Sequence, residues 1–308
     1  MCTCFEAWLG RLAFPLLFSA AGIVAWWAHA PASAAWLMPL LVAAVGLAAF
    51  GLERVIPFEP SWNAGSDTPS DLAYLASTAV FAHVGEAIAW SAAIAVASQL
   101  PLVDGAWPRD WPVFAQIALA LAVGDLMPYL YHRASHESRG FLWRVHAVHH
   151  APERLYTLNF ARFHPLNAAL TAGLTLAPLV ALGAEPHILF VAGVLHNAHG
   201  VLSHANVDFR LGPLNAVFSM AELHRWHHAR DPALADGNYG ATLLIWDWAF
   251  GTRRDPGRRV PRDGVGLWPG STVASGWAAQ WLRALLGVIR MRVSRVSAGG
   301  RCCMPKSP

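Results

Sequence analysis

Charged residues are scarce in this sequence. They make up 13% of its 308 residues, whereas apolar residues make up 55%, and a soluble globular domain typically has about 25% charged residues. This composition argues against an ordinary soluble enzyme and points to the lipid bilayer. The formal net charge is only +3, and the sequence contains no dense basic block and no RNA- or DNA-binding motif. We therefore expect no nucleic-acid partner.

Cysteine is absent from the body of the chain. Cys2 and Cys4 lie at one end, and Cys302 and Cys303 lie at the other. This placement implies no disulfide framework, and we interpret the four as free thiols, with acylation or metal binding as the alternative. The sequence also lacks a dinucleotide-binding glycine fingerprint, a cysteine set for an iron–sulfur centre and a haem-attachment motif. Any electrons that the protein uses must therefore come from a partner.

Long apolar runs are abundant. A membrane-spanning helix needs about 20 apolar residues, so the runs predict an all-α membrane protein with four to six transmembrane or membrane-embedded helices. They cover residues 12–30, 35–51, 72–99, 112–131, 166–184 and 186–203. The first run lacks a basic leading segment and a small-residue cleavage site, so we expect a retained anchor. The polar, Pro/Gly/Ser-rich segment 52–71 is typical of a loop between two helical hairpins.

Arginines indicate the orientation of these helices. Basic residues cluster after the fourth run and after the last run, whereas the short ALGAE connection between the fifth and sixth runs has none. They are Arg133, Arg139, Arg144, Arg154 and Arg162, followed by Arg253, Arg254, Arg258, Arg259 and Arg262. Both regions should face the cytoplasm. We therefore expect a cytoplasmic helical cap formed by residues 132–165 and 205–252, in what the composition suggests is a bacterial inner membrane.

Histidine is concentrated in one part of the chain. Of 15 histidines, all but His29 and His83 fall between residues 132 and 228. Eight occupy three motifs: HRASH (His132, His136), HAVHH (His146, His149, His150) and HRWHH (His224, His227, His228). We interpret isolated histidines such as His187 as core or interfacial groups.

The spacing within these motifs suits metal ligands. Residues three and four apart share a helical face, so HxxxH presents two imidazoles to one ion. HxxHH presents a pair and turns a third imidazole by about 100° toward a second ion. Burying so many imidazoles without partners would cost on the order of several kcal/mol for each unsatisfied group. The motifs therefore predict a histidine-rich site for two metals.

Residues 120–253 resemble the fatty acid hydroxylase and sterol desaturase superfamily of membrane non-haem di-iron enzymes. The resemblance rests on GDLMPYLYHRASHE, LWRVHAVHH, RFHPLN, LSHANVDFRLGPLNAVFSMAELHRWHHARD and NYGATLLIWDWAFGT, in that order. We accordingly divide the chain into N-terminal transmembrane hairpins (1–111), a histidine-box catalytic domain (112–253) with a membrane hairpin at 166–203, and a cytoplasmic basic tail (254–308).

The resemblance implies nine ligands, which are the eight motif histidines and His204 of a further box. This box departs from the full HxxxH pattern of some members, because Gly200 stands where a histidine would be needed. We choose His199 as the tenth ligand. His196 or a water molecule is the alternative.

Several other residues are candidates to support the ligands. Asp125 lies seven residues before His132, on the same helical face, where its carboxylate could accept the free N–H of a ligating imidazole. A polar residue at the membrane surface is the alternative. His164, which matches a recurring feature of the family, is expected to support the ligands or to mark a helix entry, and direct metal ligation is the alternative. The remaining candidates, for which ordinary capping or loop hydrogen bonds are an equal alternative, are Glu137, Asp231, Asp236, Asn238 and Asp247.

Spacing does not choose the metal, because imidazole-rich sites suit zinc, copper, iron or nickel. The resemblance implies two non-haem iron ions, dioxygen and a separate electron-donor protein. It further implies hydroxylation or desaturation of a C–H bond in a lipid such as a sterol or a fatty acyl chain, held in a dry pocket. The alternative is a histidine-rich membrane protein that stores or transports a divalent metal. A transporter should place its ligands at mid-membrane, whereas these motifs flank the apolar runs, which favours the enzyme.

Overall fold

The computed structural model describes residues 4–30, 34–65, 68–97, 106–138, 140–268, 271 and 276–286. In these segments the regular structure is helical, with a few isolated β-bridges. Four helices are long and apolar enough to cross a membrane: α1 (Cys4–Ala28), α2 (Ala34–Val55), α3 (Thr68–Ala97) and α4 (Val113–Ser138). Two shorter apolar helices follow, α6 (Pro165–Ala181) and α7 (Pro186–His204). Each of the six apolar runs therefore contains a helix among the described residues, and the predicted all-α membrane architecture is confirmed.

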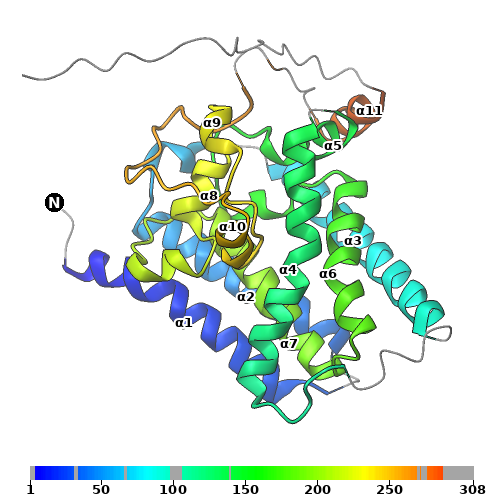
Figure 1. Cartoon of the computed structure of the whole chain (residues 1–308). Coiled ribbons are helices and arrows are strands. Elements are labelled where there is room, and N and C mark those ends of the chain that lie inside the picture. Colours follow the sequence, from blue (N-terminus) through cyan, green and yellow to red (C-terminus); the bar gives the residue numbers. More distant parts are fainter. Residues whose placement is uncertain are drawn as a thin grey trace, which may run out of the picture.

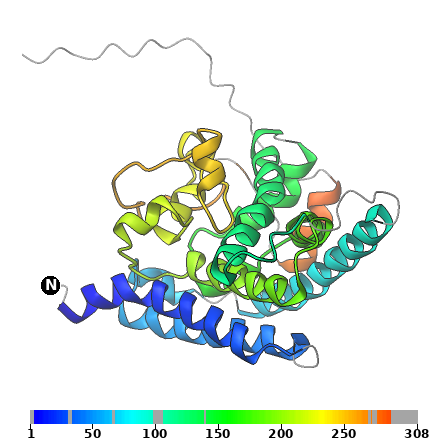
Figure 2. The ribbon, with the colours of Figure 1, turned by 60° about the horizontal axis from the view of Figure 1, so that its bottom comes forward.

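Helices α1 and α2 run side by side along one flank of the molecule and pack against α7 (Figure 2). The main hydrophobic core lies at this junction, where Ala25, Ala49 and Val194 are fully buried. The outward faces of α1 and α2 instead expose large apolar side chains, including Trp27 and Leu47. Such outward apolar faces suit contact with lipid chains.

Helices α3 and α6 approach each other closely at two glycines. A Cβ at Gly85 would lie 1.9 Å from the carbonyl oxygen of Ala169, and a Cβ at Gly173 would lie 2.9 Å from the carbonyl oxygen of Gly85. Only glycine permits this approach. Helix α4 packs against both α6 and α7, so these three helices support the segments that carry the histidines.

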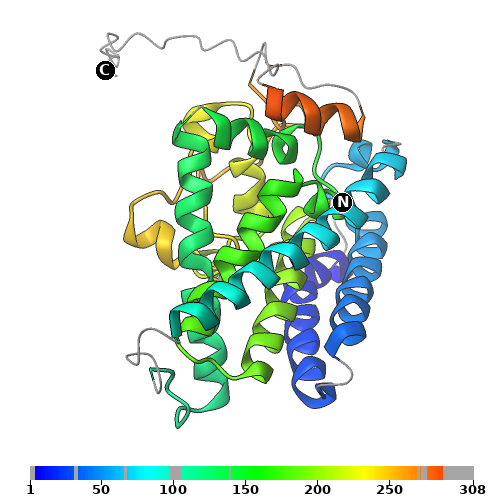
Figure 3. The same cartoon turned by 90° about the vertical axis from the view of Figure 1, so that its right-hand side faces the viewer.

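Short helices and loops form the cap, which packs alongside α4 (Figure 1) and reaches the middle of this helix, where Trp246 Nε1 donates to the Ala122 carbonyl. The α-helices are α5 (Phe141–His150), α8 (Ala221–His227), α9 (Pro232–Ala235) and α10 (Ile245–Ala249), and the 3₁₀ turns are Pro60–Ala64, Thr157–Ala161 and Gly212–Ala216. The last described helix, α11 (Trp277–Leu286), packs over α3 and α5 (Figure 3).

The polypeptide after residue 253 continues the cap. The N–H of Gly266 donates to the His228 carbonyl at 3.0 Å, and Val260 and Val265 are buried in one cluster with Trp226. Apolar residues of this segment therefore cover part of the cap. The tail beyond residue 286, including Cys302 and Cys303, lies outside the described residues, as does Cys2. Cys4 is an exposed free thiol.

Candidate metal centre

Nine of the predicted ligands come together as two groups of imidazoles. Within each group, one ring nitrogen of every residue lies within 4.8 Å of the others. The first group contains His132, His136, His146, His150 and His227, and the second contains His149, His204, His224 and His228. All of these side chains are buried except that of His132, which is half-buried.

The two HxxHH motifs are shared between the groups in a reciprocal way. In the motif on α5, the i,i+4 pair joins the first group and the i+3 histidine joins the second. In the motif at α8 the assignment is reversed. The pairs are His146–His150 and His224–His228, and the crossing residues are His149 and His227. Each motif therefore contributes to both groups.

The remaining clustered histidines lie at the ends of apolar helices. Helix α4 continues without a break from its apolar portion to Ser138, so His132 and His136 occupy its last two turns. His204 is the final residue of α7. The ends of α4 and α7 thereby fix the imidazole groups where the apolar helices meet the cap.

Five of the clustered histidines are oriented through their Nδ1 atoms. The contacts are His132 Nδ1 to the Tyr239 carbonyl (2.8 Å), His136 Nδ1 to Asp236 Oδ1 (3.2 Å), His146 Nδ1 to Asn167 Oδ1 (3.0 Å), His204 Nδ1 to the Gly200 carbonyl (2.7 Å) and His227 Nδ1 to the Gly237 carbonyl (2.9 Å). An oxygen acceptor requires the proton to be on Nδ1, so a neutral ring keeps a lone pair on Nε2. This arrangement is typical of metal-ligating histidine.

The Nε2 atoms fit a bound metal ion. Those of His132 and His227 are buried and have no hydrogen-bond partner among the described residues. Four contacts between Nε2 atoms of neighbouring histidines measure 2.9–3.1 Å. At a metal–nitrogen distance of about 2.1 Å, ligands at right angles lie about 3.0 Å apart and opposite ligands about 4.2 Å apart. Each group therefore has the dimensions of a coordination sphere around a single ion.

Burial keeps the cap histidines neutral. Desolvation is the main cause, and repulsion from neighbouring histidines adds to it. Together they lower the pKa well below its ordinary value at His146, His149, His150, His224, His227 and His228. Since neutral imidazole is the form that binds a metal, these lone pairs are available at neutral pH.

Asp125 supports the site in a different way from the one expected. Its carboxylate accepts the backbone N–H groups of Thr242 (2.9 Å) and Leu243 (2.7 Å) and lies 3.6 Å from His196. Asp125 therefore anchors the cap loop at Thr242 and Leu243 to α4 and does not accept the N–H of a clustered histidine. The reason is that this part of α4 faces the loop, which supplies two unpaired backbone donors.

Asp247 is connected to His132 through the backbone of one intervening residue, Tyr239. Its carboxylate accepts the N–H groups of Tyr239 (2.9 Å) and Gly240 (2.8 Å) and the hydroxyl of Thr252 (2.6 Å). Burial raises its pKa. Because the Tyr239 carbonyl accepts the Nδ1–H of His132, Asp247 positions the acceptor that orients this ligand.

Asn238 holds the same loop from its other side. It has a φ of 54°, in the left-handed region that asparagine tolerates. Its amide nitrogen donates to the carbonyls of Leu223 (3.3 Å) and Arg254 (2.8 Å), and its amide oxygen accepts the Arg254 N–H at 2.8 Å. Asn238 therefore connects its loop to α8 and to the segment at Arg254. Its side chain forms no hydrogen bond to a clustered histidine among the described residues.

The other candidate acids have separate positions. Asp236 contacts His136. Glu137 forms an exposed ion pair with Arg133 at 2.8 Å, and Asp231 caps α9. Only Asp236 of these three contacts a clustered histidine within the described segments.

The RFHPLN motif contributes a residue that the sequence reasoning missed. His164 is the N-cap of α6, where its Nδ1 accepts the Leu166 N–H at 3.1 Å. The next turn places Asn167 against His146. The motif was the available signal for Asn167. Gly237 and Tyr239 were also missed, and since they act through backbone carbonyls, no residue type marks them.

His199 lies outside both groups. Its ring is fully buried, with its centroid 6.0 Å from that of Phe14 and 6.2 Å from that of Phe218. Neither of its ring nitrogens has a hydrogen-bond partner among the described residues. His196 bonds instead to the Thr242 hydroxyl at 2.9 Å. The second group therefore gathers four imidazoles, one fewer than the first.

Comparison with known proteins places the chain in a family. Residues 117–252 match the family described as Fatty acid hydroxylase, and this segment contains all nine clustered histidines. Over 250 residues the chain is 35% identical to the ornithine lipid hydroxylase OlsE of Rhizobium tropici, a match that covers 80% of this chain and 74% of that protein. The chain belongs to the fatty acid hydroxylase family. This confirms the resemblance drawn from the histidine motifs, and the four long apolar helices make this family member an integral membrane protein.

More distant members share a smaller part of the chain. The alkylglycerol monooxygenase of Caenorhabditis elegans is 32% identical over 173 residues, which is 56% of this chain and 33% of that protein. The very-long-chain aldehyde decarbonylase GL1-8 of Oryza sativa subsp. indica is 31% identical over 160 residues, covering 51% of this chain and 57% of that protein. No solved structure matches this fatty acid hydroxylase family member.

Proposed function

We propose that this chain is a membrane-bound di-iron oxygenase that hydroxylates a C–H bond of a lipid, using dioxygen and electrons from a separate protein. The same site could instead catalyse desaturation of the lipid, which is the second form of this C–H oxidation. The observation that carries the proposal is the pair of all-imidazole groups, of five and four ligands, in a family with lipid hydroxylases and monooxygenases among its members.

The relative whose alignment covers 80% of this chain is named for ornithine lipid. A lipid with an amino-acid headgroup is therefore the substrate class that we propose. Alkylglycerol, from the name of a shorter match, is the second candidate to test.

Bound iron would supply the oxidising power for dioxygen-dependent attack on an unreactive C–H bond. The chain would hold the two ions through the nine imidazoles, with their Nδ1 contacts fixing the ring orientations. A Cβ at Gly200 would meet no heavy atom within 4 Å. We place the approach of the substrate in this open space beside His204, because a catalytic metal site needs a position that no protein ligand fills.

The orientation and the electron donor are also part of the proposal. The arginines on both sides of the apolar hairpin favour a cap on the cytoplasmic side of a bacterial inner membrane.

Five arginines and two aspartates lie within residues 253–263, here termed the basic loop. This loop lies against the last histidine motif, where Trp226 Nε1 donates to the Arg258 carbonyl at 3.2 Å. Its charge fits an acidic electron carrier.

Metal storage or transport is the competing function. A transport pathway would distribute ligands toward the middle of the membrane, whereas the nine clustered imidazoles gather where the apolar helices meet the cap. Their tethered Nδ1 atoms also fix the geometry instead of letting ligands exchange, which favours the enzyme.

The test compares metal content and lipid products in cells that express the natural sequence, His149→Ala or His83→Ala. His83 is a matched control, because it lies on α3 and is exposed beside Glu86. We expect two irons per chain and a hydroxylated or unsaturated lipid from the natural sequence and from His83→Ala, and loss of both from His149→Ala. A single zinc per chain with unchanged lipids in all three would contradict the proposal.

A further inference from the structure

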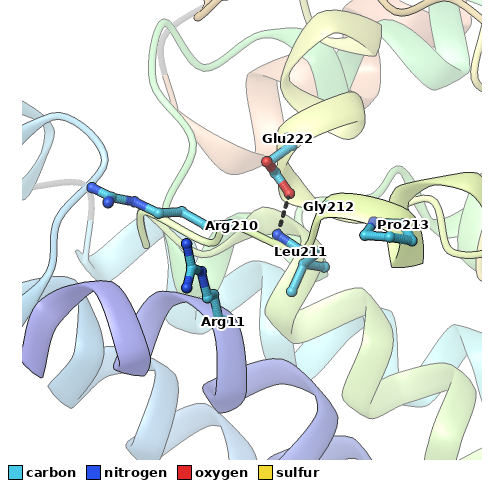
Figure 4. A pocket seen from close by; sticks show the side chains of 6 residues that line it. All are labelled: Arg11, Arg210, Leu211, Gly212, Pro213 and Glu222. Carbon is cyan, nitrogen blue, oxygen red and sulfur yellow. Dashed lines mark hydrogen bonds between the residues drawn. The ribbon is translucent and has the colours of Figure 1, made fainter. Parts of the chain in front are cut away.

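An open pocket of about 500 Å³ lies where the first turns of α1 meet the cap (Figure 4). It is lined by Arg11, Arg210, Leu211, Gly212, Pro213 and Glu222. None of these residues contributes a metal ligand or a ligand contact in the site described above. The pocket therefore needs an explanation of its own.

Close backbone contact builds the pocket. The N–H of Arg210 donates to the Gly10 carbonyl at 2.9 Å. A Cβ at Gly10 would lie 2.6 Å from the Asp208 carbonyl oxygen, so only glycine allows the loop to dock on α1 at this point. The docked loop places Arg210 and Arg11 beside the same opening.

One side of the pocket is cationic. The Arg210 guanidinium is oriented by Asp208, with Nη2 2.7 Å from Oδ2. Arg11 projects from α1 and is exposed, with its guanidinium carbon 6.0 Å from the ring centroid of Trp8. Two guanidinium groups beside one opening suit a carboxylate or a phosphate.

The other side carries an acceptor. Glu222 Oε2 accepts the Leu211 N–H at 3.0 Å and the side-chain amide of Asn215 at 2.6 Å. Its second oxygen, Oε1, has no hydrogen-bond partner among the described residues, so it remains available to a ligand donor. The pocket thus offers cations and a carboxylate acceptor, the complement of a zwitterion.

The surface of α1 beside the pocket is apolar. Leu12 and Leu16 are 43% and 63% exposed, and Trp8 is 58% exposed. An arginine and a tryptophan near the end of an apolar helix mark the level of the membrane interface. Lipid chains that lie along Leu12 and Leu16 would therefore bring their headgroup to the level of the pocket.

We propose that this pocket binds the headgroup of a zwitterionic membrane lipid. The anionic group lies between Arg11 and Arg210, and the ammonium group lies at Glu222. Ornithine lipid, which carries a free carboxylate and a free ammonium, has this chemistry. The site goes beyond the proposed reaction, because lipid binding here requires neither metal nor turnover.

Binding of three probes to the full chain in a neutral detergent tests this inference. The probes are ornithine lipid, a short-chain phosphatidylglycerol that has the anion but no ammonium, and inorganic phosphate, which has no lipid chains. Arg11→Gln removes one cation and Glu222→Gln keeps an amide acceptor without the charge. Arg109→Gln is the control for Arg11→Gln, because Arg109 is an exposed arginine that precedes α4 at its end away from the cap.

We expect the natural protein to bind ornithine lipid at least tenfold more tightly than phosphatidylglycerol, and phosphate most weakly. Arg11→Gln should weaken the binding of both lipids about tenfold, because a charge-assisted contact is lost. Glu222→Gln should weaken only ornithine lipid, and Arg109→Gln should change neither. Equal binding of phosphate and lipid, equal binding of the two lipids, or equal affinities in the two arginine variants would each overturn the assignment. These outcomes do not depend on whether the protein oxidises lipids.

Discussion

His204 and Gly200 lie one turn apart at the end of α7, and the Nδ1–H of His204 donates to the Gly200 carbonyl oxygen at 2.7 Å. This bond leaves the His204 Nε2 directed into the second imidazole group, 3.1 Å from His149 Nε2 and 2.9 Å from His224 Nε2. Gly200 occupies the position at which an HxxxH motif would supply one more imidazole. The second group is therefore incomplete at the place where α7 carries no side chain.

Replacing Gly200 by histidine should complete this group. Residues four apart share a helical face, and a side chain at position 200 has free space, so the new imidazole can reach the ion that we propose at His204. We expect Gly200→His to retain the second metal at least tenfold longer during dialysis against a chelator. Lipid oxidation should fall, because the open position is filled.

Gly200→Ala is the matched control for this substitution. It adds a Cβ but no ligand, so its metal retention should equal that of the natural protein. Equal retention in Gly200→His and Gly200→Ala would show that position 200 does not face the second ion.

The helices and eight of the nine clustered histidines were accessible from the sequence for simple physical reasons, whereas His204 followed only from the family resemblance. Apolar runs of about 20 residues have few options other than spanning helices, and ligands three and four residues apart on a helix are neighbours whatever the rest of the fold does. The spacing alone did not show which member of each HxxHH motif crosses to the other group. That assignment depends on how α5 and α8 face each other.

The supporting contacts were harder to predict because they depend on tertiary packing. Asp125 has the helical spacing of a partner for His132, but the loop donors at Thr242 and Leu243 occupy its carboxylate. His199 lies on α7, which also carries His204, yet its ring packs against Phe14 and Phe218. Neither outcome has a signature in residue type or local spacing.

Asn167 should be needed for metal binding although it is not a ligand. Asn167→Ala removes the acceptor of the His146 Nδ1–H and leaves a buried donor unpaired, at a cost of about 1–3 kcal/mol. We expect metal affinity to fall roughly 10- to 100-fold, as is typical when the partner of a ligating histidine is lost. Titration of the metal-free protein measures this change.

Asn167→Asp tests the reason for this loss, because it keeps an oxygen acceptor at the same position. Its affinity should remain closer to that of the natural protein than that of Asn167→Ala does. Equal losses in the two variants would assign Asn167 a packing role instead.

Acid should destabilise the metal-free protein. Burial lowers the pKa of cap histidines such as His149 and His224 well below the ordinary value, so below about pH 6.5 the unfolded chain binds protons that the folded chain does not. The contribution of these neutral histidines to the free energy of unfolding is therefore fully present above this pH. It is lost as the pH falls toward their pKa values in the folded protein. Each such histidine contributes up to about 1.4 kcal/mol per pH unit.

Denaturant unfolding of the metal-free protein from pH 8 to pH 5 measures this dependence. His149→Gln removes one of the groups and should make the loss of stability with falling pH shallower, whereas His83→Gln, on the exposed side of α3, should not. A free energy of unfolding that stays constant over this range would contradict the burial of neutral imidazoles.

The basic loop should control the encounter with an acidic electron donor. Arg258 lies over the ring of Trp226, with its guanidinium carbon 5.3 Å from the centroid, and Trp226 directly precedes the ligand His227. With a plant-type ferredoxin as the acidic probe, we expect Arg258→Glu to raise the KM for ferredoxin about tenfold at low ionic strength and to change kcat less. The difference should shrink as salt is added, because charges on the surface are screened. Arg109→Glu makes the same charge change at the far end of α4 and should leave this KM unaltered. If both variants raise the KM equally, net charge rather than the basic loop governs the encounter, and if neither does, the donor binds elsewhere.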